Sequence, residues 1–461
     1  MKRIMTRSLI VWIVTFAFLG GLIFLGVRIV LHNDEWVQQP FNGHMAASGG
    51  LAKAGRIYDR NGTLLAHSEN DTRLYHDNAS TREALLHVVG DNSLNISTAI
   101  QSRYRTSLTG YSFILGLGLP ESLRPNSDVK LTVDADACRA AYEALGGRKG
   151  ACVVYNYKTG EVLCDVSAPG YDPQYPPDIT EENESEYDGV YLDNVVSSTF
   201  TPGSTFKIIT AAAAVENIPD IYSQTFSCPG SVEIGGNTIT CESAHGDQSF
   251  SEAFANSCNC AFAQIAVQVG GEKMQATAER MGFNNKELRM SDIPLATSHY
   301  DAKKADENSL AWSGIGQHED LANPMLMAMI CSAVANNGSA VSPYIVEDDG
   351  KLLDKLGITI NKMQNTEMMS ADTAARLHEL MKASAEGYSW RGVSVAGLDF
   401  CAKTGTAEVG EDKEPTAWFV GFTEDEKHPY AFAAVVLEGG YGIDAATPVV
   451  NAAVSKLVNG W

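Results

Sequence analysis

One uninterrupted apolar segment near the N-terminus constrains the fold of this chain more than any other feature. Residues Ser8 to Val27 carry no charged side chain, and a helix needs about 20 apolar residues to cross a bilayer. The segment is apolar on every face, which does not suit a helix of a soluble core, and it is long for the apolar region of a cleaved signal peptide. The sequence therefore predicts one uncleaved transmembrane anchor over residues 8–30.

The charges around this segment predict its orientation. Lys2, Arg3 and Arg7 precede it, and basic residues tend to stay on the cytoplasmic side. Residues 1–7 are therefore expected to form a cytoplasmic tail, and the rest of the chain is expected to lie outside the cell membrane. The formal net charge of -22 argues against nucleic acid as a partner.

The chain after the anchor divides into two parts. Residues 31–130 combine a polar stalk with short, turn-punctuated segments, which predicts a small α+β non-catalytic module. Residues 131–461 carry stronger periodic signals, including a strand that leads into a helix capped by Asp134 and a hairpin about Lys158 to Gly160. Further strands are expected at 399–406, 417–422 and 430–437. The sequence therefore predicts an α+β fold, in which helices flank an antiparallel sheet.

The chain has nine cysteines, so at least one of them is unpaired. Cys228 and Cys241 flank a hairpin-like stretch with a Gly-Gly turn, which makes a local disulfide possible. Cys228, Cys241, His245 and Cys258 could instead bind zinc, but their spacing lacks the paired Cys-x-x-Cys pattern of many zinc sites. The sequence therefore favours a chain without a metal site.

The stretch TPGSTFKIIT places Ser204 and Lys207 three residues apart at the predicted start of a helix. Residues with this spacing share one helix face, and the first turn of a helix leaves backbone N–H groups unpaired. Such a serine has an acceptor for its proton and donors for an oxyanion, provided that burial or a second cation keeps the lysine neutral. Alone, the pair is a weak signal, because it also arises by chance.

Two further stretches of the sequence strengthen the catalytic interpretation of Ser204 and Lys207. Ser257 and Asn259 form a Ser-x-Asn in a predicted turn between helical segments. Lys403 to Thr406 read Lys-Thr-Gly-Thr on a predicted strand, where Gly405 would let a substrate approach the backbone. The three motifs in this order form a specific combination.

With these motifs the sequence resembles the class B penicillin-binding proteins, the membrane-anchored D,D-transpeptidases of the cell wall, and in particular the small type without C-terminal repeats. The stretches GRIYDRNG, LTVDADACRAAYEAL and STFTPGSTFKI follow in the order of that family. One departure is His318, which stands where the family usually has glycine and leaves the conformation of that loop open. The resemblance implies a transpeptidase/beta-lactamase-like domain over residues 131–461.

The resemblance also implies catalytic roles. Ser204 would be acylated by the penultimate D-alanine of a stem peptide and would pass the acyl group to an amine of a neighbouring stem peptide. Lys207 would be the general base, and Ser257 would relay a proton to the leaving nitrogen. Lys403 would keep the local field positive and Lys207 deprotonated.

The remaining motif residues would hold the substrate. Asn259 would hydrogen-bond its amide, Thr404 and Thr406 would bind its terminal carboxylate, and the backbone N–H groups of Ser204 and Thr406 would form the oxyanion hole. This chemistry needs no cofactor. The resemblance implies stem peptides, beta-lactams and the membrane as partners, together with a SEDS-family glycosyltransferase that the anchor and the N-terminal module would contact.

Three other functions share some of these motifs. A serine beta-lactamase would need a residue that activates water, and Glu307 lies in the right part of the chain but lacks the local pattern of such a residue. A D,D-carboxypeptidase differs only in preferring water to an amine. A beta-lactam-binding sensor or scaffold has no physical need for all of the catalytic residues, so the sequence favours the transpeptidase.

Overall fold

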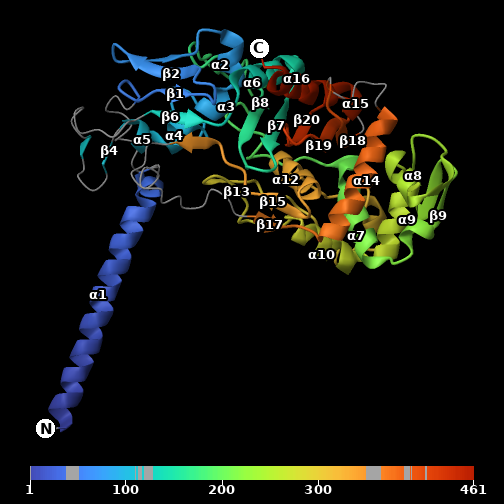
Figure 1. Ribbon diagram of the computed structural model, residues 1–461, viewed down its shortest axis with the longest axis horizontal. Coiled ribbons are helices and arrows are strands. Elements are labelled where there is room, and N and C mark those ends of the chain that lie inside the picture. The colour runs from blue at the N-terminus through green and yellow to red at the C-terminus, as the bar shows by residue number, and fades with distance from the viewer. Residues whose placement is uncertain are drawn as a thin grey trace.

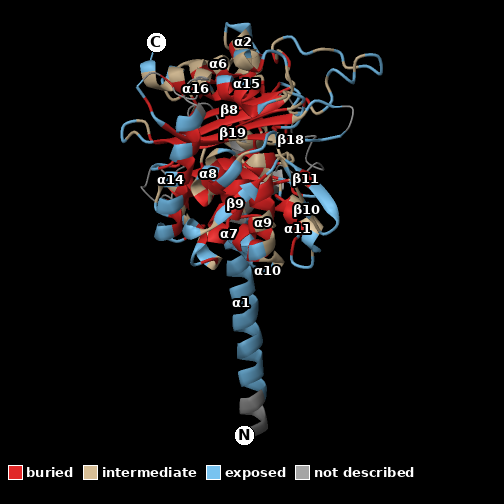
Figure 2. Cartoon of the chain, turned by 90° about the vertical axis from the view of Figure 1, so that its right-hand side faces the viewer, coloured by how far each residue is buried: buried red, intermediate tan, exposed pale blue. Residues whose placement is uncertain are grey.

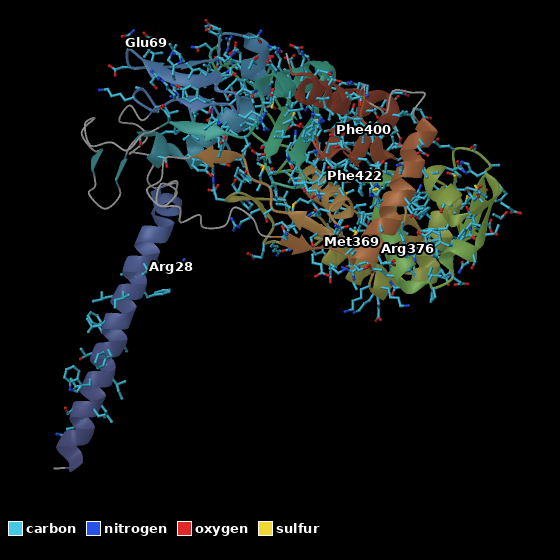
Figure 3. All side chains as sticks on the ribbon, viewed as in Figure 1. Arg28, Glu69, Met369, Arg376, Phe400 and Phe422 are labelled. Atoms are coloured by element: carbon cyan, nitrogen blue, oxygen red, sulfur yellow. The ribbon has the colours of Figure 1, made fainter. Side chains whose placement is uncertain are left out.

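The N-terminal helix α1 (Lys2–Val37) lies outside the folded body in the computed structural model (Figure 1). Its segment Arg7–Arg28 is long and apolar enough to cross a membrane, with a mean hydropathy of 2.5, and none of it is buried against the protein. Figure 3 shows the side chains of residues 7–28 of this helix standing free of other elements. The helix agrees with the predicted anchor, and its orientation stays a prediction. The structure describes residues 2–37, 51–109, 111–112, 117–118, 128–348, 365–388, 395, 397–410 and 413–460.

A five-stranded antiparallel sheet forms the centre of the larger part of the molecule, in the order β18-β19-β20-β7-β8. Its C-terminal strands join a hairpin from much earlier in the chain through the pairing of β20 with β7. Every residue of β8, β19 and β20 is buried, so both faces of the sheet are covered. The strands are β7 (Gly150–Asn156), β8 (Val162–Ala168), β18 (Phe400–Ala407), β19 (Thr416–Thr423) and β20 (Tyr430–Val436).

Helices cover the two faces of this sheet, which confirms the predicted α+β fold (Figure 2). Helices α6 and α16 pack on each other and on one face, α12 packs across β7, β19 and β20, and α14 lies along β18. The carboxylate of Asp134 accepts a hydrogen bond from Ala137 N–H at 2.9 Å, as expected for the cap of α6. These helices are α6 (Ala135–Leu145), α12 (Pro324–Ala335), α14 (Ala371–Tyr388) and α16 (Thr447–Asn459).

A second five-stranded sheet, in the order β16-β6-β1-β2-β3, lies toward the N-terminal end of the chain. Strand β6 runs parallel to β1 and antiparallel to β16, so the sheet combines strands from both sides of residue 130. The sheet therefore crosses the predicted boundary at residue 130, and the predicted domain boundaries stay a prediction. The strands are β1 (Ile57–Tyr58), β2 (Leu64–Glu69), β3 (Thr72–Tyr75), β6 (Val129–Leu131) and β16 (Val346–Asp348).

A mainly helical lobe lies on the α14 side of the central sheet (Figure 1). Its central helix α7 (Lys207–Asn217) is buried over eight consecutive residues, Lys207 to Ala214, because the residues that follow Lys207 are apolar or small on every face. Figure 3 labels Arg376 and Met369 at the α14 end of this lobe, and Phe400 and Phe422 on the neighbouring strands β18 and β19. Around α7 lie α8 (Phe250–Ala255), α9 (Asn259–Val269), α10 (Gly271–Arg280), α11 (Glu307–Ser313), β9 (Thr225–Cys228), β10 (Ser231–Ile234), β11 (Asn237–Thr240) and β12 (Gly246–Ser249).

The remaining elements are short. They are α2 (Ala79–Ala84), α3 (Leu86–Val89), α4 (Ile100–Arg103), α5 (Arg105–Thr109), β4 (Tyr111–Ser112), β5 (Leu117–Gly118), β13 (Arg289–Met290), β14 (Ile293–Pro294), β15 (Ser339–Val341), β17 (Asn365–Glu367) and α15 (Gly442–Ala445).

Candidate active site

Ser204 lies in a 3-10 turn, η3 (Gly203–Phe206), which continues directly into α7. The sequence predicts a helical first turn at this point, and the structure differs only in its tighter winding. Gly203 has a φ of 53°, and a Cβ on it would lie 2.7 Å from Thr406 O. The turn that carries Ser204 therefore lies directly against the backbone of β18. The first N–H groups of such a turn have no partner within the helix.

Lys207 is fully buried, and its amine contacts the Ser204 hydroxyl. Lys207 Nζ lies 3.0 Å from Ser204 Oγ, 2.6 Å from Ser257 O and 2.7 Å from Asn259 Oδ1. A neutral amine has two hydrogens and one lone pair. Its two hydrogens fit the carbonyl and amide oxygens, which can only accept, so the lone pair faces Ser204 Oγ. This arrangement can take the proton of the serine.

Ser257 lies in a left-handed turn between α8 and α9, with a φ of 52°. Ser257 N–H donates to Phe254 O, and Cys258 N–H donates to Ala253 O, which is the Schellman arrangement that ends many helices. Glycine usually occupies the left-handed position, because other residues are strained there. A serine at this position has its hydroxyl 2.9 Å from Lys403 Nζ and 3.3 Å from Lys207 Nζ. The structure thus places the Ser-x-Asn in the predicted turn.

Asn259, the first residue of α9, is held at both ends of its side chain. Its Oδ1 accepts from Lys207, and its Nδ2 donates to Thr240 O at 3.0 Å. The amide nitrogen has a second hydrogen that can reach a ligand. Its backbone N–H donates to Cys241 Sγ at 3.3 Å. Thr240 was not predicted as a site residue, because no local pattern relates a strand end to a helix start 19 residues later.

Lys403 is also buried, on β18. Its Nζ donates to Ser257 Oγ at 2.9 Å and to Thr404 O at 3.1 Å. Within the described part of the chain, no carboxylate lies within ion-pair distance of Lys207 or Lys403. The two amines therefore share a pocket of hydroxyl and carbonyl groups, joined by the Ser257 hydroxyl.

Burial lowers the pKa values of both lysines. It lowers the pKa of Lys207 to about 8. The pKa of Lys403 falls well below its usual value, first because of burial and second because of the charge on Lys207. The resemblance implied that Lys403 keeps its charge and Lys207 loses it, but burial favours the neutral form of both amines.

Comparison with known proteins identifies the family of this chain. The model of the penicillin binding protein transpeptidase domain matches residues 150–455. The chain belongs to this family. A peptidoglycan D,D-transpeptidase PbpA of Mycolicibacterium smegmatis is 30% identical over 354 residues, which are 71% of this chain and 71% of the relative. The class B resemblance inferred from the motifs is confirmed.

Solved structures of penicillin-binding proteins share the fold. The D,D-transpeptidase domain of a peptidoglycan glycosyltransferase from Eggerthella lenta has 27% identity and a TM-score of 0.72, over 88% of this chain and 99% of that one. The penicillin G acyl-enzyme complex of penicillin-binding protein A from M. tuberculosis has 26% identity and a TM-score of 0.74, over 88% of this chain and 100% of that one. The predicted transpeptidase fold is therefore confirmed.

The Lys-Thr-Gly-Thr motif of this penicillin-binding protein lies on β18, the edge strand of the central sheet. Thr404 and Thr406 are half-buried and lie on one face of the strand. The predicted reason for Gly405, the close approach of a substrate to the backbone, stays a prediction. A Cβ on Gly405 would come within 2.9 Å of Thr205 Cγ2 and 3.0 Å of Pro202 O, so the glycine lets β18 pack against the Ser204 turn.

We expect Gly405→Ala to separate β18 from η3. Overpacking of this kind costs about 1–3 kcal/mol, and a displacement of about 1 Å in a catalytic group costs about 10²-fold in rate. The variant should therefore lose thermal stability and be acylated by benzylpenicillin about 10²-fold more slowly. Gly387→Ala in α14 is the matched control, because a Cβ there meets nothing within 4 Å; alanine should stabilise that helix by about 0.5–1 kcal/mol. Wild-type stability and rate in Gly405→Ala would contradict this account of the packing.

His318 adopts the backbone conformation that glycine adopts freely. Its φ is 72°, and the side chain is exposed. Two residues earlier, Gly316 O accepts a hydrogen bond from Gly203 N–H at 2.9 Å. The departure from the family pattern therefore leaves a left-handed residue in the loop, and the loop stays bonded to the turn that carries Ser204.

The predicted disulfide between Cys228 and Cys241 is absent, and both residues are free thiols. The expected hairpin does form, from β10 and β11. Cys228 instead ends β9, which pairs with β12, so the two cysteines belong to different sheets. Both sulfurs face His245 Nδ1, each at 3.5 Å.

Proposed function

We propose that this penicillin-binding protein is a peptidoglycan D,D-transpeptidase that works through an acyl-enzyme on Ser204. The observation that carries the proposal is the 3.0 Å contact between Ser204 Oγ and the buried amine of Lys207. Similarity to the D,D-transpeptidase PbpA supports the reaction, and similarity to a penicillin G acyl-enzyme supports covalent capture of beta-lactams.

Acylation begins with proton transfer. Lys207 accepts the proton of Ser204 as Oγ attacks the carbonyl carbon of the penultimate D-alanine. The backbone N–H groups of Ser204 and Thr406 stabilise the oxyanion that forms. The proton then reaches the leaving nitrogen through the hydroxyl of Ser257, which lies near both lysine amines. The terminal D-alanine leaves, and an amine of another stem peptide takes the acyl group from Ser204.

The edge position of β18 accounts for substrate binding in this proposal. An edge strand presents unpaired N–H and C=O groups to which an extended peptide can add. The hydroxyls of Thr404 and Thr406 hold the terminal carboxylate of the peptide, and the free Nδ2 hydrogen of Asn259 bonds to its acyl amide.

Glu307 does not fit the role of a water-activating residue. It is exposed at the start of α11, where Asp306 caps the helix through Ser309 N–H. Because Glu307 is not placed to activate water, we favour transfer of the acyl group to an amine over hydrolysis by a beta-lactamase.

The proposal is tested by identifying the products of the acylation step and of the transfer step. The full-length chain in detergent is incubated with benzylpenicillin, its intact mass is followed over hours, and the modified peptide is sequenced by mass spectrometry. We expect a one-to-one adduct on Ser204 that persists. With a stem pentapeptide and an amine acceptor we expect D-alanine and a cross-linked product. Rapid loss of the adduct with consumption of penicillin would instead identify a beta-lactamase, free tetrapeptide alone would identify a carboxypeptidase, and no adduct would favour a scaffold.

The variant Ser257→Gly removes the hydroxyl of Ser257 and keeps its left-handed backbone conformation. Glycine adopts a positive φ without strain, so thermal stability should be kept or raised. Acylation should fall about 10²-fold, because the proton relay is lost. Asn337→Gly is the matched control, because Asn337 is exposed and has a φ of 55°. The relay role is wrong if both variants are acylated at the wild-type rate.

The membrane orientation and a SEDS-family glycosyltransferase partner also belong to this proposal. The long apolar helix α1 supports membrane anchoring. Co-purification of the full-length chain from its native membrane should recover such a glycosyltransferase, and protease added outside intact cells should cut the folded part. Repeated failure to recover a polymerase removes the support for that partner.

A further inference from the structure

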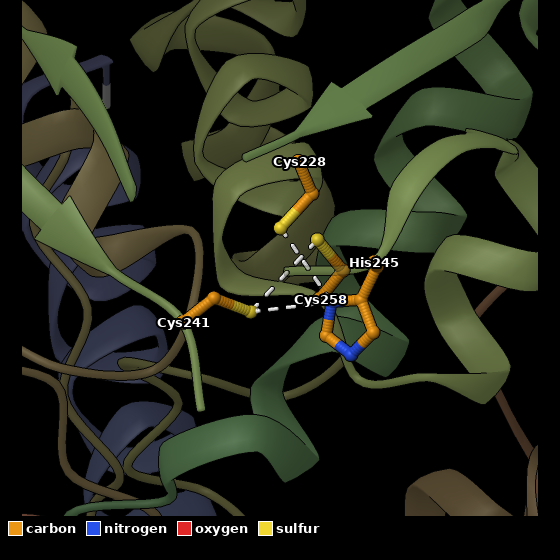
Figure 4. Close-up of side chains that lie close together, drawn as sticks. All are labelled: Cys228, Cys241, His245 and Cys258. Carbon is orange, nitrogen blue, oxygen red and sulfur yellow. Dashed lines mark hydrogen bonds between the residues drawn. The ribbon is translucent and has the colours of Figure 1, made fainter. Parts of the chain in front are cut away.

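Four metal-ligating side chains converge beside the Ser-x-Asn turn: Cys228, Cys241, His245 and Cys258 (Figure 4). Their ligand atoms all lie within 4.8 Å of one another. Cys228 and Cys258 are buried, and Cys241 and His245 are half-buried. Three sulfurs and one imidazole nitrogen are the ligand set of many structural zinc sites.

The measured distances fit the edges of a tetrahedron around one zinc ion. With Zn–S bonds of about 2.3 Å and a Zn–N bond of about 2.0 Å, the tetrahedral edges are ~3.8 Å between two sulfurs and ~3.5 Å between sulfur and nitrogen. His245 Nδ1 lies 3.5 Å from both Cys228 Sγ and Cys241 Sγ. Cys241 Sγ lies 4.0 Å from Cys258 Sγ, whereas a disulfide requires about 2.05 Å.

Groups around the cluster orient the ligands as zinc requires. His245 Nε2 lies 3.5 Å from Ser243 Oγ, which leaves Nδ1 directed at the sulfurs and is typical of an imidazole ligand held by an outer partner. Backbone N–H groups donate to two of the sulfurs: Asn259 to Cys241 at 3.3 Å and Ala261 to Cys258 at 3.4 Å. Sulfur atoms that accept such bonds are stabilised as thiolates, the form that binds a metal.

A metal ion at this point would cross-link four separate segments. The four residues lie at the end of β9, after β11, before β12 and at the N-cap of α9. Strands β9 and β12 form one two-stranded sheet, and β10 and β11 form another. Two-stranded sheets are only marginally stable in water, and a metal bound by all four segments would join both to α9.

We propose that Cys228, Cys241, His245 and Cys258 bind one structural zinc ion that positions the Ser-x-Asn segment. Cys258 stands between Ser257 and Asn259, Cys241 accepts the N–H of Asn259, and Thr240 accepts from its side chain. The zinc ion therefore fixes the two residues that hold the Lys207 amine. The spacing of these residues in the sequence did not favour a zinc site, but the ligands come from separate elements and need no paired spacing. The effect on acylation rests on the proposed function, whereas metal binding does not.

The test begins with the metal content of the full-length chain, purified in detergent after growth with added zinc and analysed by inductively coupled plasma mass spectrometry. We expect one zinc per chain in the wild type and in Cys331→Ala, a buried free thiol elsewhere. We expect none in Cys228→Ser or His245→Ala. His245→Cys should keep the zinc, because four thiolates also form a structural zinc site. X-ray absorption of the wild type should show three sulfur ligands and one nitrogen.

The rate of acylation by benzylpenicillin shows whether the zinc ion positions the Ser-x-Asn segment or only stabilises the fold. Loss of zinc should slow the acylation step about tenfold or more, and His245→Cys should restore both the zinc and the rate. A wild-type chain that contains no zinc and gives no tetrahedral thiolate spectrum with Co²⁺ would overturn the proposal, as would a mass showing a disulfide within the cluster. Zinc in a chain that penicillin never acylates would support the metal site and reject the proposed function.

Discussion

Ser204→Ala is expected to abolish covalent capture of benzylpenicillin. Alanine keeps the turn but removes the nucleophilic oxygen, so no acyl-enzyme can form, and D-alanine release should fall more than about 10⁴-fold. Intact-protein mass spectrometry after hours of exposure measures the first effect, and chromatography of a stem pentapeptide reaction measures the second.

Ser251→Ala in α8 is the control for this variant, and we expect it to be acylated like the wild type. The fold of Ser204→Ala should be retained, because the turn is held by Phe206, whose ring stacks on Tyr300 at 4.8 Å. A stoichiometric adduct in Ser204→Ala would place the nucleophile elsewhere.

Lys207→Met is expected to slow acylation by about 10²–10⁴-fold, because it removes the general base. Methionine is unbranched and fits a buried site. The variant should nevertheless lose stability, because the buried oxygens of Ser257 and Asn259 each lose a donor, at about 1–3 kcal/mol per group. The measurements are the acylation rate with benzylpenicillin and thermal unfolding. Lys273→Met on the exposed face of α10 is the control and should change neither.

The pH dependence of acylation tests the same base. Lys207 can accept a proton only as a neutral amine, and burial lowers its pKa to about 8. The wild-type rate should therefore rise with pH through about 8 and then level off, and Lys207→Met should show no such rise. A wild-type rate that is constant from about pH 6 to 9.5 would exclude Lys207 as the base.

The buried lysines illustrate what sequence pattern can and cannot determine. The spacing of Ser204 and Lys207 on one helical turn is a local property, and it predicted their contact correctly. The low pKa of Lys403 on β18 depends on burial and on the charge of Lys207, which lies almost 200 residues away in the chain. No local pattern contains that information, and the charge expected on Lys403 was consequently not supported.

The contacts of Gly405 and of two cysteines also could not be predicted from local sequence pattern. The close approach of Gly405 to Pro202 and Thr205 depends on how a strand packs against a distant turn, which the motif itself does not contain. The sequence left a disulfide between Cys228 and Cys241 possible, whereas in the fold both sulfurs face His245.

The sequence by itself determined the membrane-length helix, the α+β class, the order of the three motifs and the family. These depend on local apolar runs, helix and strand periodicity, and short residue patterns, all of which are encoded by neighbours in the chain. Only the tertiary structure decided which atoms meet: the Ser257 hydroxyl between two buried amines and the three sulfurs around His245. Those contacts join segments that are distant in sequence, and the packing of separate elements alone brings them together.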